Sequence, residues 1–316
     1  MENIPYLLLC DYDLTLFNTK ERSPRGIGLK EGYEHAVQET FGPKGLDHYQ
    51  NEGGLQNRAP SEVVASLMKQ DMSLIGHARE KHAELSSSLK NLPATLAAQW
   101  KETDLVFLLS EMLVHFKLQL FLGEIGPDWP RPYPGVCDFF HIVADLRERE
   151  KLPVQTGILS SGHTHFIEKT LSLWGIPSPR IMVTDDDIRP LGYPKEPKDK
   201  VKPAPFSFKF LQLRWLKQLN GLSPTHPSHV QVSLPRIMYF GDDSEKDGGL
   251  ARNVGVPFGW FQGNEKGKLG FSPNQQFPIG SFTFSDWTKL CDFIGQGSVK
   301  KLFSSGAPLA KIFSLF

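Results

Sequence analysis

The chain has few cysteines, and they are poorly spaced for metal or disulfide chemistry. Only three occur in 316 residues. Cys10, Cys137 and Cys291 lie far apart, and none belongs to a Cys-x-x-Cys pair. An odd number of isolated cysteines excludes a zinc ribbon and a disulfide framework. It also fits a reducing compartment, so we expect a cytoplasmic protein.

The chain has no excess of charge of either sign. Lys plus Arg and Asp plus Glu both total 35, which gives a formal net charge of zero. Because there is no basic excess and no polybasic stretch, we expect neither a nucleic-acid partner nor a membrane surface. No uninterrupted apolar stretch reaches the roughly 20 residues that span a bilayer. Residues 1–5 lack the basic start of a signal peptide. The oligomeric state stays open.

What the chain does contain is enough apolar sequence for a core, arranged in alternating β and α patterns. Short apolar runs predict strands, and apolar residues at three- and four-residue spacing predict helices. The predicted strands are 6–10, 154–159, 181–183, 236–240 and 257–261. The predicted helices that separate the later strands are 136–149, 164–174, 208–219 and 247–254. This alternation predicts an α/β fold with a parallel, doubly wound sheet.

A long span after the first strand has a helical pattern throughout. Helices are predicted at 31–41, 61–71 and 93–122, and no segment between them has a convincing strand pattern. We therefore expect an inserted all-helical domain. The predicted boundaries give a core domain of 1–22 with 126–295, a helical domain of 23–125, and a tail of 296–316 without an assigned role.

Two carboxylates follow the first predicted strand. Asp11 and Asp13 come directly after the apolar run 6–10, and Thr15 follows them. In an open α/β sheet, ligands bind at the carboxyl ends of the strands. Two carboxylates this close repel each other unless a cation or a proton lies between them. The pair therefore predicts a site for a hard divalent cation, with one carboxylate left for chemistry. A plain polar turn is the alternative.

Two further segments with hydroxyl or cationic groups lie at or near predicted strand ends. Ser160, Ser161 and Gly162 follow the strand 154–159, and a hydroxyl with backbone N–H groups before a helix can hold an anion. Lys202 precedes a Pro-Ala-Pro run that fixes its exit direction, so that it can hold a phosphate or offset carboxylate repulsion. Taken alone, an ordinary Ser-Gly turn and a solvated lysine explain these segments as well.

A second acidic cluster follows the strand 236–240. Asp242 and Asp243 come after Gly241, and Asp247 lies four residues beyond Asp243. Residues four apart share one face if a helix begins here. Helix capping by Asp243 is the alternative to a ligand role.

The four motifs together resemble those of the haloacid dehalogenase superfamily. They are Asp-x-Asp-x-Thr, Ser-Ser-Gly, Lys-Pro-x-Pro and Gly-Asp-Asp-x-x-x-Asp, in that order, and the resemblance covers roughly 5–20 and 130–262. It implies a Rossmann-like core, and the helical insertion resembles the cap that many members carry after the first motif.

The resemblance also implies roles for these residues. Asp11 would be the nucleophile that forms an aspartyl-phosphate, and Asp13 the general acid and then the base. Mg²⁺ would bind the Asp11 carboxylate, the backbone carbonyl of Asp13 and an acid of the last motif. Ser160 and Lys202 would hold the phosphoryl group, with Ser161 and Gly162 beside them. We favour Asp243 as the inner metal ligand, with Asp242 close behind and Asp247 in support.

The second carboxylate decides between reaction types. Dehalogenases of the superfamily lack it, whereas Asp13 suits cleavage of a phosphoester. We therefore predict a Mg²⁺-dependent phosphatase that acts on a small phosphorylated metabolite. A phosphomutase of the β-phosphoglucomutase kind and a catalytically silent binding module stay open. In the cap, Arg58 could meet a second anionic group, although an exposed arginine without such a role is more common. His163 and His165 have no evident acidic partner and are expected at the surface.

Overall fold

The computed structural model describes residues 5–54, 59–88, 104–148, 153–191, 197–220, 237–263, 272–273 and 276–295. The chain divides into two compact units. Unit 1 comprises Met1–Thr19 with Pro130–Phe316, and unit 2 comprises Lys20–Trp129.

Unit 1 contains one seven-stranded sheet in the order β3-β2-β1-β4-β5-β7-β6. All neighbours pair in parallel except β6 and β7, which are antiparallel. The strands are β1 (Tyr6–Cys10), β2 (Val154–Leu159), β3 (Ile181–Val183), β4 (Ile237–Gly241), β5 (Phe258–Phe261), β6 (Ser272–Pro273) and β7 (Phe282–Phe284). The chain adds β2 and β3 on one side of β1 and then returns to place β4 on the other side. The carboxyl ends of β1 and β4 therefore flank the switch point at which such sheets bind ligands.

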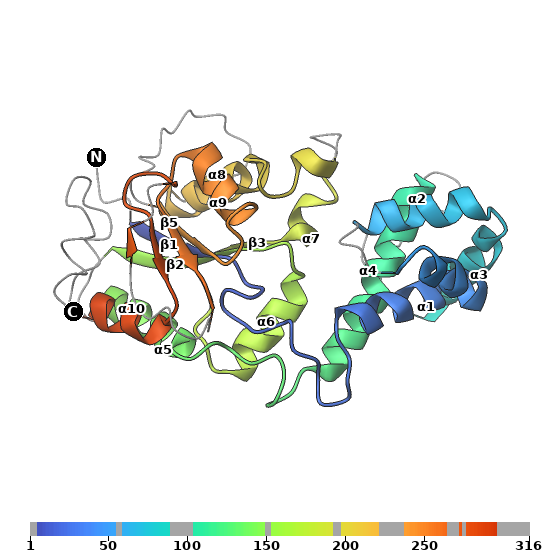
Figure 1. Cartoon of the computed structure of the whole chain (residues 1–316), viewed down its shortest axis with the longest axis horizontal. Helices are drawn as coiled ribbons and strands as arrows, with labels where there is room; N and C mark the ends of the chain where they lie inside the picture. Colours follow the sequence, from blue (N-terminus) through green and yellow to red (C-terminus); the bar gives the residue numbers. More distant parts are fainter. Residues whose placement is uncertain are drawn as a thin grey trace. The chain divides into compact units, whose positions relative to one another are not determined.

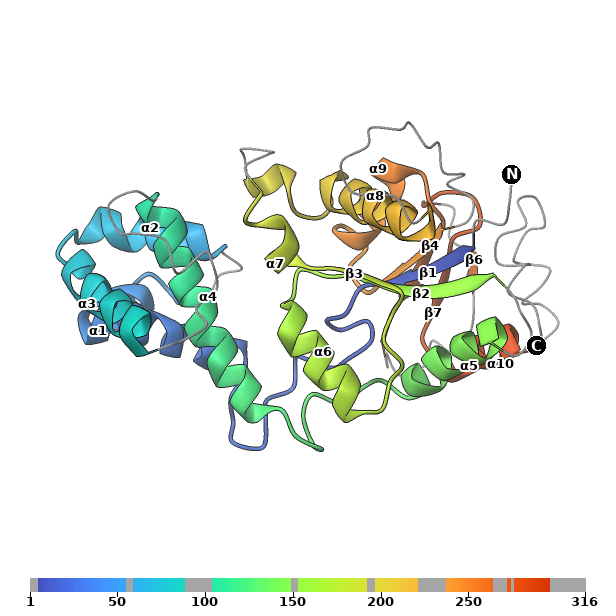
Figure 2. The same cartoon turned by 180° about the vertical axis from the view of Figure 1, so that it is seen from behind.

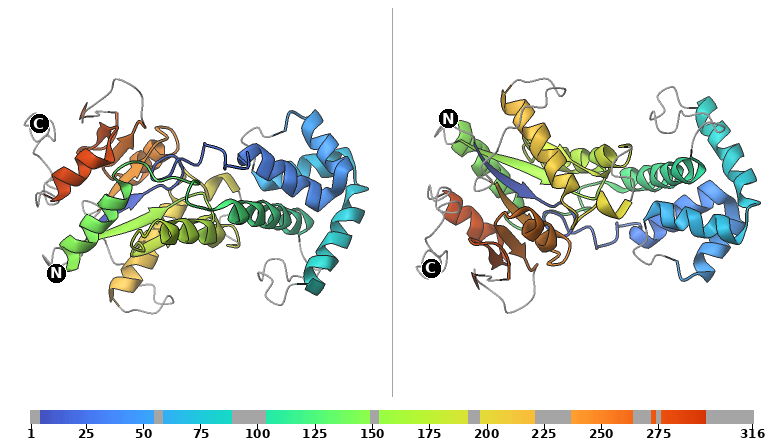
Figure 3. Two further views of the ribbon diagram at one scale, coloured as in Figure 1. Left: turned by 90° about the horizontal axis from the view of Figure 1, so that it is seen from below. Right: turned by 90° about the horizontal axis from the view of Figure 1, so that it is seen from above.

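Helices cover both faces of this sheet (Figure 1). On one face lie α8 (Phe206–Asn220) and α9 (Asp247–Val254), and on the other lie α5 (Val136–Glu148) and α10 (Trp287–Phe293), as the reverse view also shows (Figure 2). Figure 3 shows α5 and α10 side by side. The remaining helices of the unit are α6 (Thr164–Leu173), α7 (Asp185–Ile188) and the 3-10 turn η1 (Pro197–Asp199).

The side chains of β1 alternate between these two faces. Leu7 and Leu9 are fully buried in the cluster that contains Trp215 of α8. Residues of the opposite phase on β4 face the other way, because the Phe240 ring lies 5.6 Å from that of Trp287 in α10. Burial on both faces explains why the strands are continuous apolar runs. The next residue in the phase of Leu7 and Leu9 is Asp11, so its side chain continues toward the α8 side.

The structure confirms the predicted fold class of a doubly wound α/β core with a separate helical part. β1, β2, β3 and α9 have the predicted bounds. β7 and α10 were not predicted. β7 has only three residues, Phe-Thr-Phe, and this is too short for a period to be visible in the sequence.

Unit 2 consists of helices in the described residues. They are α1 (Leu29–Asn51), α2 (Pro60–Gln70), α3 (Leu74–Ser88) and α4 (Leu105–Glu124). α1 is kinked at Gly42, whose φ is 74°, and Pro43 follows it. A left-handed glycine ends a helix and a proline begins the next, so the predicted end at residue 41 corresponds to the kink. Helix α3 was not predicted, and the predicted helix 93–122 begins only at Leu105 within the described residues.

α4 is the most apolar helix of unit 2. By length and composition alone it could cross a membrane, and it is the one described helix that meets this test. Leu108 and Met112 of α4 are fully buried against Val37 and Phe41 of α1. A helix at the centre of a bundle has the same composition as a membrane span, so the test does not separate the two.

Candidate active site

The acidic loops after β1 and β4 meet at the sheet switch point. The backbone N–H of Asp11 donates to the carbonyl of Phe240 at 2.8 Å and extends the pairing of the two strands. Gly241 then lets the Asp247 side chain lie directly against the end of β4, because a Cβ at Gly241 would lie 2.5 Å from it. The sheet register and one glycine thus bring Asp11 and Asp247 into a common site.

Lys202 lies at the centre of this site. Its Nζ donates to Oδ1 of Asp11 at 2.6 Å, to Oδ1 of Asp247 at 2.7 Å and to the hydroxyl of Tyr239 at 3.0 Å. The Tyr239 hydroxyl donates to the same Asp247 oxygen at 2.7 Å. The Lys202 side chain is 7% exposed. All three protons of the ammonium have acceptors, so its position is fixed. The sequence motifs gave no signal for Tyr239.

The protonation states follow from burial and these contacts. Burial opposes the charged form of Lys202, but Asp11 and Asp247 raise its pKa well above the ordinary value. Burial also raises the pKa of Asp11, the Lys202 ammonium acts against that rise, and Asp247 and Asp13 add to it. Burial raises the pKa of the Tyr239 phenol well above its usual range, so this hydroxyl stays neutral. Lys202 is therefore the positive charge that stabilises the two buried carboxylates.

The sequence favoured Asp243 as the inner metal ligand, but the structure places Asp242 beside Asp11. Carboxylate oxygens of Asp11, Asp242 and Asp247 lie within 4.8 Å of one another. Asp243 instead accepts the backbone N–H groups of Glu245 at 2.8 Å and Lys246 at 2.9 Å. Asp243 thus stabilises the turn before α9 and not the helix itself, whose N-cap is Lys246 without a side-chain cap hydrogen bond.

Three carboxylates with one ammonium leave a formal excess of negative charge in a largely buried place. Burial and the neighbouring Asp247 raise the pKa of Asp242 to about 6. Oxygen donors this close together fit a hard divalent cation such as Mg²⁺. The donor set of the described residues is therefore suitable for the metal that the motifs imply.

Asp13 lies beside the serine loop. Its Oδ2 and the Oγ of Ser160 both lie within 3.4 Å of the position that a Cβ would take at Gly162. Between Asp13 and Thr15, Leu14 has a φ of 58°, the one positive value among the described non-glycine residues. Such backbone costs of order 1–3 kcal/mol and occurs mainly at functional sites. Asp11 thus contacts Lys202, whereas Asp13 lies beside Ser160 and Gly162.

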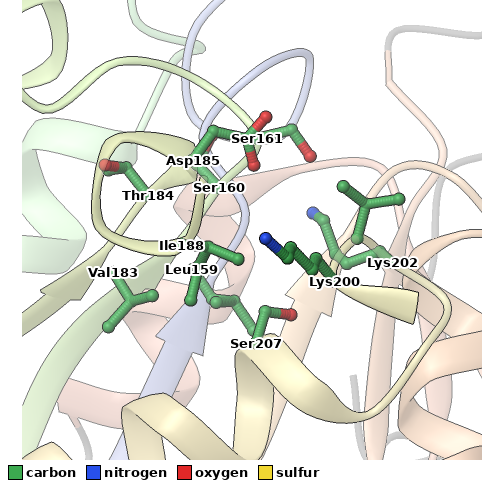
Figure 4. Close-up of a pocket in the computed structure, with 11 residues that line it drawn as sticks. Leu159, Ser160, Ser161, Val183, Thr184, Asp185, Ile188, Lys200, Lys202 and Ser207 are labelled. Carbon is green, nitrogen blue, oxygen red and sulfur yellow. The ribbon is translucent and has the colours of Figure 1, made fainter. Parts of the chain in front are cut away.

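Ser160 directly follows β2 and is one of the residues that line a small pocket (Figure 4). It is buried, and its Oγ accepts the N–H of Gly162 at 2.9 Å. Lys202 lines the same pocket, as do Ser161, Thr184 and Ser207. Ser161 itself is exposed. Lys200 also reaches this pocket, but its Nζ donates to the backbone carbonyls of Arg189 and Leu191.

The expectation that His163 lies at the surface was wrong. His163 is buried, and its Nδ1 lies 2.9 Å from Oδ1 of Asp186. Burial opposes ionisation of Asp186, but the contacts with His163, Arg189 and the Thr164 N–H lower its pKa to about 2. The acidic partner lies 23 residues away in α7, so no local pattern could indicate it. His165 is exposed, as expected. Arg58 lies outside the described residues.

Comparisons with known proteins give a distant likeness. A scan against protein-family models and a search of curated proteins found no match. One solved structure that matches is a 2-haloacid dehalogenase from Pseudomonas syringae pv. tomato. The two sequences are 15% identical, the match covers 93% of this chain and 100% of that chain, and the TM-score is 0.46. A HAD phosphatase from Thermococcus onnurineus matches with 15% identity, coverage of 92% and 98%, and a TM-score of 0.43.

A third match is the HAD-hydrolase YfnB from Bacillus subtilis, described as bound to magnesium. It has 13% identity, coverage of 83% of this chain and 91% of that chain, and a TM-score of 0.35. These proteins belong to the superfamily that the sequence motifs resemble, and they include both dehalogenases and a phosphatase. At such identities and TM-scores the function has to be inferred from the side chains of the site.

Proposed function

We propose that the chain is a Mg²⁺-dependent phosphatase of the haloacid dehalogenase superfamily, acting on a small phosphomonoester through an aspartyl-phosphate. The observation that supports this most directly is the position of Lys202, whose Nζ lies 2.6 Å from Asp11 and 2.7 Å from Asp247. Asp242 lies beside the same two carboxylates. A buried lysine with three clustered acids suits the handling of a dianionic phosphate together with a cation.

In the first step an oxygen of Asp11 attacks phosphorus, and the bond from phosphorus to the leaving oxygen breaks. Asp13 gives its proton to that oxygen, so that the alcohol departs neutral. Lys202 and the Ser160 hydroxyl hold the phosphoryl oxygens during the transfer. Because Lys202 also bonds Asp11, it fixes the nucleophile in the direction of attack.

In the second step Asp13, now ionised, removes a proton from water. The water oxygen attacks phosphorus, and the bond to Asp11 breaks to release inorganic phosphate and restore the carboxylate. Mg²⁺, held by Asp11, Asp242 and Asp247 with the Asp13 carbonyl, would neutralise charge as the anionic groups approach each other. A cytoplasmic location is a further proposal, made from the sequence.

Asp13 favours phosphoester cleavage over attack on carbon. Its carboxylate lies next to the Ser160 loop, where we place the phosphoryl group, so it is the acid available to the leaving oxygen. Halide needs no proton in order to leave, so a dehalogenase has no use for an acid at this position. The clustered acids around Asp11 point the same way, because a cation helps a dianionic phosphate more than a neutral carbon centre.

The proposal is tested with a generic aryl phosphate and a 2-haloacid as paired substrates. We expect hydrolysis of the aryl phosphate that requires Mg²⁺ and stops in excess chelator. We expect no halide release from 2-chloropropionate under the same conditions. Halide release without metal, together with an unreactive aryl phosphate, would reverse the assignment to a dehalogenase.

The adjacent acids Asp242 and Asp243 form a matched pair for testing the metal site. Asp242→Asn should weaken Mg²⁺ binding roughly 10-fold or more, because replacing a residue that only supports a metal ligand already lowers affinity by this factor. Asp243→Asn should leave the affinity unchanged, because Asp243 bonds backbone N–H groups instead. Isothermal titration of the apo-proteins with MgCl₂ measures both. Equal losses in the two variants, or a larger loss in Asp243→Asn, would contradict the structural assignment.

A further inference from the structure

A tryptophan near the end of the described chain contacts the backbone of the first acidic loop. The Nε1 of Trp287, in α10, donates to the carbonyl oxygen of Thr15 at 3.0 Å. Trp287 is completely buried. Its partner is 272 residues away in sequence and lies two residues after Asp13. The four sequence motifs all end before this helix begins, so none of them indicates the contact.

Thr15 connects this contact to the second acidic loop. Its side-chain hydroxyl donates to Oδ1 of Asp242 at 3.1 Å. A second tryptophan acts from the other side, because Nε1 of Trp260 in β5 donates to the backbone carbonyl of Asp242 at 2.9 Å. One indole N–H thus binds the backbone carbonyl of Thr15, and another binds that of Asp242. The hydrogen bond from the Thr15 hydroxyl to the Asp242 carboxylate joins the two residues.

The Trp287 ring has little freedom to move. It lies 4.9 Å from Phe139, 5.1 Å from Phe284 and 5.6 Å from Phe240 between ring centroids. α10 also packs closely on the segment before α5, because a Cβ at Gly135 would lie 2.5 Å from the backbone nitrogen of Thr288. Tight packing against these three rings fixes the position of the indole N–H, and therefore the geometry of the hydrogen bond that it donates.

We propose that Trp287 is a positioning residue for the active site, which holds the loop 11–17 so that Thr15 can orient Asp242. α10 is accordingly a required part of the site, although it lies outside the motifs. The predicted effect on the metal rests on the proposed function. The predicted effect on the loop does not depend on that function.

The test compares Trp287→Phe with Trp215→Phe. Trp215 is also completely buried and also donates one indole hydrogen bond, but its acceptor at 2.8 Å is Gln155 of β2, which belongs to neither acidic loop. Both variants lose the same atoms. Hydrogen exchange by mass spectrometry reports the loop 11–17 in the metal-free protein, and calorimetric titration reports Mg²⁺ affinity. Thr15→Val removes only the hydroxyl contact with Asp242 and serves as a second variant if Trp287→Phe does not fold.

We expect several-fold faster hydrogen exchange in residues 11–17 of Trp287→Phe than of Trp215→Phe. We also expect Trp287→Phe to bind Mg²⁺ roughly 10-fold more weakly than Trp215→Phe, because residues that orient metal ligands have effects of this size. Thr15→Val should weaken Mg²⁺ binding similarly. Identical exchange in the two tryptophan variants would overturn the proposal, and so would faster exchange with unchanged Mg²⁺ affinity. If the wild-type protein binds no Mg²⁺, the proposed function fails, and the exchange comparison alone decides on Trp287.

Discussion

Replacing Asp11 by Asn is expected to abolish phosphatase activity while the protein stays folded. Loss of a covalent nucleophile typically costs roughly 10⁴-fold or more in kcat. Asn has nearly the shape of Asp but cannot attack phosphorus as an anion. It also keeps an oxygen that can accept the Lys202 hydrogen bond now 2.6 Å long. Steady-state hydrolysis of an aryl phosphate at saturating Mg²⁺ measures the effect, and circular dichroism checks the fold.

A chemical trap distinguishes a lost nucleophile from a misplaced one. Beryllium fluoride mimics the phosphoryl group on an aspartate, so the wild-type protein should bind it with Mg²⁺ and gain thermal stability, as any ligand of the native state confers. Asp11→Asn should show no gain. Retention of full activity by Asp11→Asn would exclude the aspartyl-phosphate mechanism. An inactive wild-type protein that binds neither the mimic nor Mg²⁺ would favour a silent binding module.

The strands and most residues of the site could be predicted from the sequence. The contacts that these residues make with distant parts of the chain could not. Runs such as Tyr6–Cys10 and Val154–Leu159 are buried on both faces, so composition alone identifies them. Motif order then placed Asp11, Ser160 and Lys202 at strand ends or in nearby loops. The structure brings Lys202 and Asp11 into direct contact.

Other features depend on contacts between residues that are distant in sequence. The four-residue spacing to Asp247 favoured Asp243 over Asp242 in the sequence, but in the folded chain Asp243 accepts the N–H groups of Glu245 and Lys246 in a turn. In the sequence, Tyr239 is one of several residues of an apolar strand. Its hydrogen bond to Asp247 is known only from the structure. The Trp287 contact joins segments 272 residues apart. Periodicity and spacing report local structure, so they cannot predict such pairs.

Replacing Lys202 by Met should destabilise the protein more than any other single change in the site. Met keeps much of the side-chain volume but removes the ammonium, which leaves the buried carboxylates of Asp11 and Asp247 without their cation. Breaking a buried ion pair in this way costs about 3 kcal/mol or more of unfolding free energy. Urea denaturation of the metal-free protein measures the loss. Lys200→Met is the matched control, and it should cost about 1 kcal/mol because the acceptors of Lys200 within the described residues are backbone carbonyls.

A double variant identifies the cause of the destabilisation. If Lys202→Met acts by leaving charge unpaired, the added change Asp247→Asn removes one of the two carboxylates and should restore part of the lost stability. The pair should therefore show a favourable interaction energy in a double-mutant cycle, within the 0.5–3 kcal/mol range of directly contacting groups. Mg²⁺ should also stabilise Lys202→Met, since a bound cation can offset the same charge. Additive losses in the cycle, with no response to Mg²⁺, would mean that Lys202 stabilises the fold through packing and not through Asp11 and Asp247.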